Sequence, residues 1–410
     1  MQNIKFALIL LTLPLLFTQC GNDPVSARQA LASLNVSEKK LVASTHVFGF
    51  DLFGRIAAAQ PGKNVFISPL SASMALGMAL NGADGTTETA MRETLGLTGL
   101  SAEDANAAYR HVIDLLLSLD PKVQMELANS IWYRKEYTFE SAFLNANKTY
   151  FSAQVQGLDF DSPSVKDTIN KWVSDHTHGR IPDIVDGISP QTVMFLINAI
   201  YFKGTWAYRF EKNDTRQESF YPTDDVTISV PMMRQMGRFG YLETENFQAV
   251  ELPYGNKEFC MTVLLPNPSV AIDDFIGTIT PELWDDWTSR LVVREADIAL
   301  PRFKFSYERT LNDDLMALGM GVAFSSTEAD FTRMYPPGEL FISNVKQKAF
   351  VEVNEEGTEA AAATSVEVSV TSIGDTVAIR VDRPFVFAIR ERQSGTIMFV
   401  GRVIHPKFEG

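Results

Sequence analysis

The residue types that could carry enzyme chemistry do not assemble into a catalytic pattern. Ser37 and Lys40 stand in a Ser-x-x-Lys arrangement, which places a lysine near a serine nucleophile, but no Lys-Thr-Gly partner follows. The chain also lacks a Gly-x-Ser-x-Gly elbow. A serine triad would need a histidine beside an activated serine, and nothing marks one of the five histidines for that role: His46, His111, His176, His178 and His405. We therefore predict no catalytic residues.

His176 and His178 come nearest to a metal-binding pair. A zinc site needs further ligands at suitable spacing, and the expected acidic or cysteine companions are missing. Because Gly179 follows, the pair is better explained as the end of a surface helix, where histidine suits the helix dipole. We expect no metal and no cofactor.

The clearest chemical pattern lies in a long segment near the C-terminus, where residues alternate with a period of two, as in a half-buried strand. One set is small or β-branched and comprises Thr358, Ala360, Ala362, Thr364, Val366, Val368 and Val370. The interleaved set can face water and comprises Glu359, Ala361, Ala363, Ser365, Glu367, Ser369 and Thr371. A strand with such a narrow buried face is suited to sliding between strands already in place.

The same segment suits an exposed loop, because it is long, rich in alanine and bracketed by Gly357 and Gly374. A plain helix is the alternative, since alanine has the highest helix propensity, but the period of two disfavours it. A segment compatible with both a loop and a buried strand is typical of a conformational switch.

The N-terminus carries an export signal. Lys5 precedes an apolar run over residues 6–17, which is too short to span a bilayer but suits a signal peptide. Cys20 stands where a lipoprotein signal is cut and its cysteine lipidated. The preceding Phe17-Thr18-Gln19 fits that signal poorly, because small residues are expected there, so cleavage by an ordinary signal peptidase stays open. We expect an exported protein, either a cell-surface or periplasmic lipoprotein or a secreted one.

Chain organisation and composition complete this picture. We expect a signal peptide over residues 1–20, a flexible tether over 21–38 and a single domain over 39–410. The formal net charge of −14 argues against nucleic-acid partners. With Cys20 lipidated or removed, Cys260 is the remaining cysteine, so no intramolecular disulfide forms. We predict a monomer that meets the membrane only through an N-terminal lipid.

Helices are predicted mostly in the first half of the domain. Ser68 is suited to cap a helix that has Pro69 in its first position and extends through Leu80. Gly96 indicates the end of another helix.

Strands dominate the second half. Alternation over Val123–Tyr133 and the apolar run Val193–Phe202 predict two long strands. Shorter strands are predicted at Ala249–Pro253, Phe259–Leu265, Ala296–Phe305, Phe341–Val353, Val377–Val381, Phe385–Arg390 and Ile397–Ile404. The predicted fold class is α+β, with several mainly antiparallel sheets in one domain.

Short motifs from about Lys40 to Pro406 resemble, in their joint order and spacing, those of the serpin family of serine protease inhibitors. They are Asn64–Ser71, Asn198–Trp206, Glu251–Tyr254, Leu300–Phe303, Arg383–Phe387 and Phe399–Val403. The chain is similar to a bacterial exported member. The resemblance implies a serpin-like domain with an exposed reactive loop at about residues 355–376.

Within this loop, one run resembles the hinge of inhibitory serpins: Glu355, Glu356, Gly357, Thr358, Glu359, Ala360, Ala361, Ala362, Ala363 and Thr364. Thr358, Ala360 and Ala362 are small and uncharged, which permits insertion into a sheet, because burying an unpaired charge costs several kcal/mol. The resemblance thus implies an irreversible inhibitor that traps its target protease as a covalent acyl-enzyme. The alternative is a serpin-fold binding protein that does not inhibit.

By the family's count from the hinge, the reactive bond joins Thr371 and Ser372. The stretch from there to Pro384 is slightly longer than in familiar members, which leaves Ser372 or Ile373 as alternatives for the first specificity position. None of these residues is charged or aromatic. We therefore expect an elastase-like or subtilisin-like target.

Other positions correspond to the polar cluster beneath the opening sheet, called the shutter. Ser68, Ser71 and Asn198 match it, and Gln347 stands where many members carry a histidine. Glutamine still donates and accepts hydrogen bonds. Trp206 matches the tryptophan at the top of the sheet where insertion begins, although a plain core role is the alternative.

Overall fold

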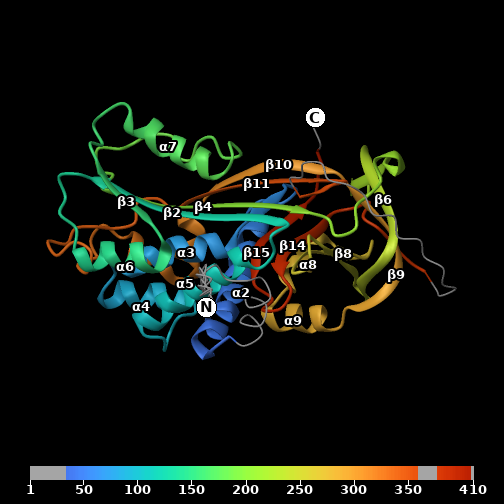
Figure 1. Cartoon of the computed structure of the whole chain (residues 1–410), viewed down its shortest axis with the longest axis horizontal. Helices are drawn as coiled ribbons and strands as arrows, with labels where there is room; N and C mark the ends of the chain where they lie inside the picture. Colours follow the sequence, from blue (N-terminus) through green and yellow to red (C-terminus); the bar gives the residue numbers. More distant parts are fainter. Residues whose placement is uncertain (1–33, 359–375, 408–410) are drawn as a thin grey trace, which may run out of the picture.

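The computed structural model describes residues 34–358 and 376–407, which fold around two β-sheets (Figure 1). A six-stranded sheet runs along the long axis, and α7 (Val165–His176) lies on its outer face (Figure 1). The opposite, inner face packs on α3 (Pro69–Leu80), which also contacts the nine-stranded sheet. The fold is α+β, as predicted.

Each of the other helices contacts α3 or α2 (Val36–Ala59). They are α2, α4 (Gly85–Thr94), α5 (Ala102–Ser118), α6 (Ser141–Phe151), α8 (Ile272–Gly277), α9 (Pro281–Ser289) and α10 (Asn312–Leu315), with short turns η1 (Lys212–Asp214), η2 (Met316–Met320) and η3 (Gly321–Phe324). The longer helices lie in the first half of the chain, as predicted.

The six-stranded sheet has β12 between two much longer strands. Its order is β10 (Phe303–Thr310), β11 (Lys346–Asn354), β12 (Gly357–Thr358), β4 (Met194–Thr205), β2 (Val123–Arg134) and β3 (Gln154–Leu158). Neighbouring strands are antiparallel except β2 and β3, which are parallel.

The nine-stranded sheet forms the other side of the core. Along its main path the order is β1 (Val65–Ile67), β15 (Ile397–Val403), β14 (Phe385–Glu391), β8 (Phe259–Pro266), β7 (Phe247–Pro253), β6 (Val226–Glu243), β9 (Val292–Pro301) and β13 (Val377–Arg380), while β5 (Arg216–Thr223) pairs with β6. Most neighbours are antiparallel, as expected, and β13 runs parallel to β9.

Two predicted helix boundaries are confirmed. The Ser68 Oγ atom accepts a hydrogen bond from the Ser71 N–H at 3.2 Å, and Pro69 occupies the first position of α3, which ends at Leu80. Gly96 follows α4 and has a φ of +68°, a conformation that favours glycine.

The long strands β2 and β4 match their predictions, but two later strands differ. The single strand predicted over Ala296–Phe305 is wrong, because the chain leaves one sheet at Arg302 and enters the other as β10. The Arg302 N–H donates to the Pro231 carbonyl, which holds this crossover in place. The strand predicted from Phe341 begins later, at β11, and Phe341 itself is exposed.

The N-terminal boundary also differs from the prediction. The tether expected over residues 21–38 is wrong in its last part, because α2 begins at Val36. Asn35 accepts a hydrogen bond from the Glu38 N–H at 3.0 Å, and the Glu38 carboxylate accepts one from the Asn35 N–H at 2.8 Å. This capping box, together with the buried Leu34, starts the domain earlier than predicted.

The two faces of β4 are distinguished by what they contact. Ile197 and Ala199 belong to a small apolar cluster with residues of α7 on the outer face. Asn198 and Ile200 face inward: the Asn198 amide reaches Met74 of α3, and Ile200 belongs to the main core. Within the ranges the structure describes, no helix combines the length and apolar character needed to cross a membrane.

Candidate functional site

The predicted hinge begins with a tight hairpin at one end of the six-stranded sheet. After β11, Glu355 and Glu356 form the turn, and β12 runs back beside β11. Gly357 pairs with Asn354 on one side and Thr205 on the other, and Thr358 pairs with Val353 and Gly204. The first two residues of β12 therefore already lie between β11 and β4.

Gly357 is required by close backbone approach. Its φ is +152°, and a Cβ atom there would lie 2.0 Å from the Gly204 carbonyl oxygen and 2.7 Å from the Thr205 Cα atom. Because both contacts are with backbone, no side chain could relieve them by moving. The glycine predicted for the hinge thus lets the chain enter the sheet.

Thr358 is buried and joins an aromatic cluster. Its hydroxyl forms a 2.5 Å hydrogen bond with the Tyr254 hydroxyl, and the Tyr254 ring stacks on Trp206 at 4.5 Å between centroids. Burial raises the pKa of Tyr254 well above its usual value, so this hydroxyl stays protonated. The Trp206 Nε1–H donates to the Asn354 carbonyl at 2.9 Å. Trp206 is therefore a buried core residue that also hydrogen-bonds the chain just before the hinge turn. The sequence had left open whether it is a core residue or the tryptophan at the top of the sheet, and its contacts agree with both.

The two hinge glutamates are held by basic residues that the sequence did not single out. Glu355 is 2% exposed and accepts a hydrogen bond from Arg302 Nε at 2.7 Å, with a further bond from Arg302 Nη2. The Glu356 carboxylate pairs with Lys212 Nζ at 2.6 Å. Arg302 lies in the motif Leu300–Phe303, one of those that carry the serpin resemblance. Membership of that motif is the only feature of the sequence that could have pointed to its pairing with Glu355.

Three of the predicted shutter residues come together below the hinge. Gln347 of β11 accepts a hydrogen bond from the Ser68 N–H at 3.1 Å and donates to the Ser68 carbonyl at 2.8 Å. The Ser68 Oγ donates to the Met398 carbonyl at 2.7 Å and also caps α3 at Ser71. This network links β11, α3 and β15, and Gln347 serves it without a titrating group.

Asn198, the fourth predicted member, bonds elsewhere. Its Nδ2 donates to the Asn129 Oδ1 at 2.6 Å, and the Asn129 Nδ2 donates to the Phe151 carbonyl at 2.7 Å. Asn129 was not predicted, since neither its type nor its spacing distinguishes it in the sequence. Asn198 and Gln347 thus face the inner side of the sheet on the two strands that flank β12.

The connection between α7 and β4, residues 177–193, crosses the outer face of the sheet and is here called the strap. At its start, His178 Nε2 lies 2.9 Å from a Glu126 carboxylate oxygen on β2. Farther along, its contacts are with β11: the Arg180 guanidinium lies over the Phe350 ring at 5.1 Å, Asp183 pairs with Lys348, and Asp186 pairs with Lys346 at 2.5 Å. The strap therefore runs from β2 to β11 and crosses the sheet beyond the end of β12.

The remaining predicted site residues lie outside the described ranges. These are the reactive-bond residues Thr371, Ser372 and Ile373, the hinge residues Glu359, Ala360, Ala361, Ala362, Ala363 and Thr364, and Cys20. The histidine pair was correctly interpreted as a helix end, because α7 stops at His176. No cluster of metal-ligating side chains occurs within the described residues, 34–358 and 376–407.

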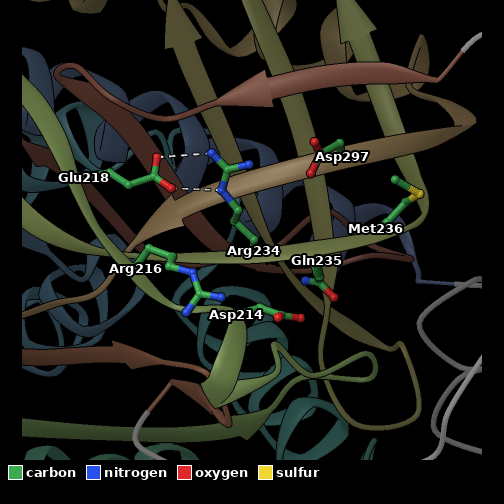
Figure 2. A pocket seen from close by; sticks show the side chains of 7 residues that line it. All are labelled: Asp214, Arg216, Glu218, Arg234, Gln235, Met236 and Asp297. Atoms are coloured by element: carbon green, nitrogen blue, oxygen red, sulfur yellow. Dashed lines mark hydrogen bonds and ion pairs between the residues drawn. The ribbon is translucent and has the colours of Figure 1, made fainter.

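A pocket of about 470 Å³ opens on the nine-stranded sheet, and two of its lining residues, Asp214 and Arg216, flank Thr215, whose hydroxyl donates to the Glu355 carboxylate (Figure 2). It is lined by Asp214, Arg216, Glu218, Arg234, Gln235, Met236 and Asp297. Arg234 donates two hydrogen bonds to Glu218, at 3.0 and 3.2 Å, which largely neutralise the charge at its centre (Figure 2). The pocket offers no nucleophile beside a general base, so we place the functional site at the hinge.

Comparisons with known proteins identify the family. A family model described as Serpin (serine protease inhibitor) matches residues 43–406. Neuroserpin of Gallus gallus is 35% identical over 369 residues, covering 87% of this chain and 90% of that protein. Leukocyte elastase inhibitor A of Rattus norvegicus is 34% identical over 380 residues, covering 90% of this chain and 100% of that protein.

Solved structures agree in fold. Human thyroxine-binding globulin complexed with thyroxine superposes with a TM-score of 0.83 at 30% identity, covering 91% of this chain and 100% of that one. The thermophilic serpin tengpin, in its native state, gives a TM-score of 0.81 at 33% identity, covering 89% and 94%. With a hinge that starts between β11 and β4 and a family match over nearly the whole domain, this chain belongs to the serpin family of serine protease inhibitors.

Proposed function

We propose that this serpin is an irreversible inhibitor that acts as a suicide substrate. The observation that carries the proposal is the position of β12. Gly357 and Thr358 pair with both β11 and β4, so the start of the hinge already lies between the two strands that would flank the inserted segment. After cleavage, residues 358–370 continue along this path as a new central strand. Their inward-facing set is small or β-branched, which suits a narrow buried face.

Insertion would carry a bound protease across the molecule. Fourteen residues of strand span roughly 46 Å at about 3.3 Å per residue. A compact domain of about 370 residues has a diameter of roughly 54 Å. A protease attached as an acyl-enzyme would be pulled against the far end of the sheet, where distortion of its triad and oxyanion hole prevents deacylation.

The proposed reactive bond joins Thr371 and Ser372, with Ser372 or Ile373 as alternatives for the first specificity position. These uncharged side chains suit the shallow pockets of elastase-like or subtilisin-like serine proteases. The similarity to a protein named leukocyte elastase inhibitor A is consistent with such a target. The protease is the one partner we propose, and the inhibitor acts as a monomer.

Incubation with a panel of serine proteases tests this function. An elastase-like or subtilisin-like enzyme should form a complex that survives boiling in detergent, and mass spectrometry of the released C-terminal peptide should place the cut at Thr371–Ser372 or next to it. Trypsin serves as the control, since no basic residue occupies these positions. Free turnover by every protease, without a stable complex, would refute the proposal.

A binding role without inhibition is the second candidate, because thyroxine-binding globulin has the same fold and was solved with thyroxine. The hinge favours inhibition instead. Gly357 and Thr358 enter the sheet without strain from side chains, and Ala360 and Ala362 continue the small inward-facing set. A charged or bulky residue in this set would oppose insertion.

We further propose that the protein is exported and anchored to the membrane by a lipid on Cys20. If Cys20 carries no lipid, we propose that the protein is secreted. The support is the apolar run over residues 6–17 followed by Cys20. Metabolic labelling with a palmitate analogue should mark the wild-type protein but not Cys20→Ala. Equal labelling of both proteins, or of neither, would leave secretion without a lipid.

A further inference from the structure

The pocket on the nine-stranded sheet lies where β6 lacks a neighbouring strand along part of one edge. β6 pairs with β9 on one edge, and with β5 and β7 on the other. The β5 ladder ends at Met232 and the β7 ladder begins at Gly240. Within the described chain, residues 233–239 therefore have a strand neighbour on one side only. Gln235 and Met236 of this stretch line the pocket, so the cavity follows from a gap in the sheet (Figure 2).

An ion-pair network links one wall of the pocket to β13. Arg234 donates two hydrogen bonds to Glu218, and Glu218 also pairs with Arg380 of β13 at 2.5 Å. On the hinge side, Thr215 stands between two lining residues, and its hydroxyl donates to the Glu355 carboxylate. β13 is the next strand after the hinge in the described chain. The pocket therefore adjoins contacts of both the hinge and the strand that follows it.

Other polar groups of the pocket have no partner. The Asp214 and Asp297 carboxylates and the Arg216 guanidinium form no hydrogen bond or ion pair with any described residue. The Gln235 Nε2 atom is buried and likewise has no hydrogen-bond partner in the described part of the chain. A buried donor left unpaired costs free energy, so a ligand that accepts from it would gain affinity. The pocket thus presents two unpaired carboxylates, one unpaired guanidinium and one unpaired amide.

These groups select a ligand that carries charges of both signs. A guanidinium recognises a carboxylate through its planar fork, and a carboxylate recognises an ammonium or guanidinium group. Phosphate or another simple anion would face the two unpaired carboxylates, and a simple amine would face Arg216. A metal ion is disfavoured too, because no cluster of metal-ligating side chains occurs among the described residues. Two carboxylates and one guanidinium instead match two cationic groups and one anionic group.

We infer that this pocket binds a free basic α-amino acid, such as arginine or lysine. Its α-carboxylate would pair with Arg216 and accept a hydrogen bond from the Gln235 amide. Its α-ammonium group and its side-chain cation would pair with Asp214 and Asp297. Met236, which is 61% exposed, offers apolar surface to the methylene chain. The volume of about 470 Å³ is ordinary for a small-molecule site, about 300–1,000 Å³.

This ligand is additional to the protease, and its site is separate from the reactive bond. Because Asp214 and Arg216 are the chain neighbours of Thr215, a ligand that pairs with both would contact the two sides of a residue that supports the hinge. The binding requires no cleavage and no movement of the loop.

Isothermal titration calorimetry of the intact, uncleaved protein tests the site, with L-arginine as the probe. We expect one arginine to bind per chain. Argininamide lacks the carboxylate and glutamine lacks the side-chain charge, so each should bind at least about tenfold more weakly, the factor expected from one charge-assisted hydrogen bond. Inorganic phosphate should not compete. No binding of arginine at millimolar concentration, equal affinity for the three compounds, or displacement of arginine by phosphate would overturn the inference.

Two variants locate the binding. Arg216→Gln should weaken arginine binding about tenfold or more and leave argininamide unchanged, because only arginine carries the carboxylate. Asp297→Asn should weaken both ligands. Arg294→Gln, on the opposite face of β9, and Asp274→Asn, on α8, are matched controls at exposed positions and should change neither. Arginine binding that survives both Arg216→Gln and Asp297→Asn would contradict this site, and that result is read independently of protease trapping.

Discussion

At the residue scale, the hinge is limited by the space between the backbones of β4 and β11, which admits only certain side chains. Gly357 has no room for a Cβ atom beside Gly204, and Thr358 is buried against Tyr254 with its hydroxyl satisfied. In the proposed mechanism insertion starts from these two residues, so a change here should act on its first step.

Thr358→Arg should convert the inhibitor into a substrate. A guanidinium at this position would be buried beside Tyr254 without a carboxylate, and leaving a buried charge unpaired costs about 3–5 kcal/mol. Entry of the strand should slow, so that deacylation overtakes it. The measurement is the ratio of inhibitor consumed per protease trapped, with the cleavage rate followed in parallel. Thr358→Ser is the control, and a Thr358→Arg protein that still traps with a ratio near that of Thr358→Ser would contradict this role.

Gln347→His should introduce a pH dependence that the wild-type protein lacks. Gln347 accepts from the Ser68 N–H and donates to the Ser68 carbonyl, a pattern that only a neutral imidazole can reproduce. Burial and this N–H would hold the folded-state pKa of the introduced histidine below its unfolded value of about 6.5. Its contribution to stability is then present above that value and lost as the pH falls through the folded pKa.

Denaturant unfolding of Gln347→His between pH 8 and pH 5 checks this, with the wild-type protein measured alongside to subtract the titration of all other groups. A difference between the two proteins that stays constant over this range would show that position 347 does not sense protonation.

Some of the residues around the hinge and the shutter could be predicted from the sequence, and others could not. Ser68, Ser71 and Gln347 were placed together by their resemblance to a family cluster, and the structure confirms their contacts. Arg302 and Tyr254 were missed as hinge partners, although both lie in quoted motifs. They meet Glu355 and Thr358 only through the folded sheets, since the chain separation is 53 and 104 residues, and local periodicity carries no information at that range.

At the element scale, the strap lies on the outer face of the sheet, over the path that we propose for the inserted strand. Its aspartates pair with Lys346 and Lys348, which project from β11 on the outer face. Lys346 lowers the pKa of Asp186, so this pair stays charged at neutral pH. Widening the gap between β4 and β11 stretches the strap, because its other end is held at Glu126 of β2.

The double variant Lys346→Gln/Lys348→Gln should insert its loop faster than the wild-type protein. Removing these lysines loosens the hold of the strap on β11, which keeps the Arg180–Phe350 contact, and also breaks their pairs with Glu308 of β10. The cost to the uncleaved form is about 0–1 kcal/mol for each partly exposed pair. The rate constant for complex formation is the measurement, and added salt should reduce the difference between the proteins.

Lys171→Gln is the matched control for the strap, since Lys171 pairs with Asp175 within α7 and makes no link to β11. If the double variant and this control form complexes at the same rate as the wild-type protein, the strap does not limit insertion.

Element types were more predictable than element ends. The cap at Ser68 and the glycine after α4 fix their helix boundaries through local chemistry, and both were predicted. The chain crossover at Arg302 was not, because β9 and β10 form one continuous apolar pattern in the sequence while belonging to different sheets. Asn35 and Glu38 form a capping box that was overlooked within the expected tether.

At the scale of the whole molecule, the six-stranded sheet contains one very short strand between two long ones. β4 and β11 flank β12, a strand of two residues, and β13 is the next strand along the chain. In the proposed mechanism, cleavage lets residues 358–370 pair along both strands. Burying Val366, Val368 and Val370 would each contribute about 1.5–3 kcal/mol, with further stabilisation from the new backbone hydrogen bonds.

The most direct test of this account is the thermal unfolding of one protein preparation before and after a protease cuts near Thr371. We expect the cleaved protein, with both fragments still associated, to unfold at a markedly higher temperature than the intact protein. Cleavage by the same protease in the Thr358→Arg variant should give a smaller increase. A cleaved wild-type protein that unfolds at the same temperature as the intact one would contradict loop insertion as the source of inhibition.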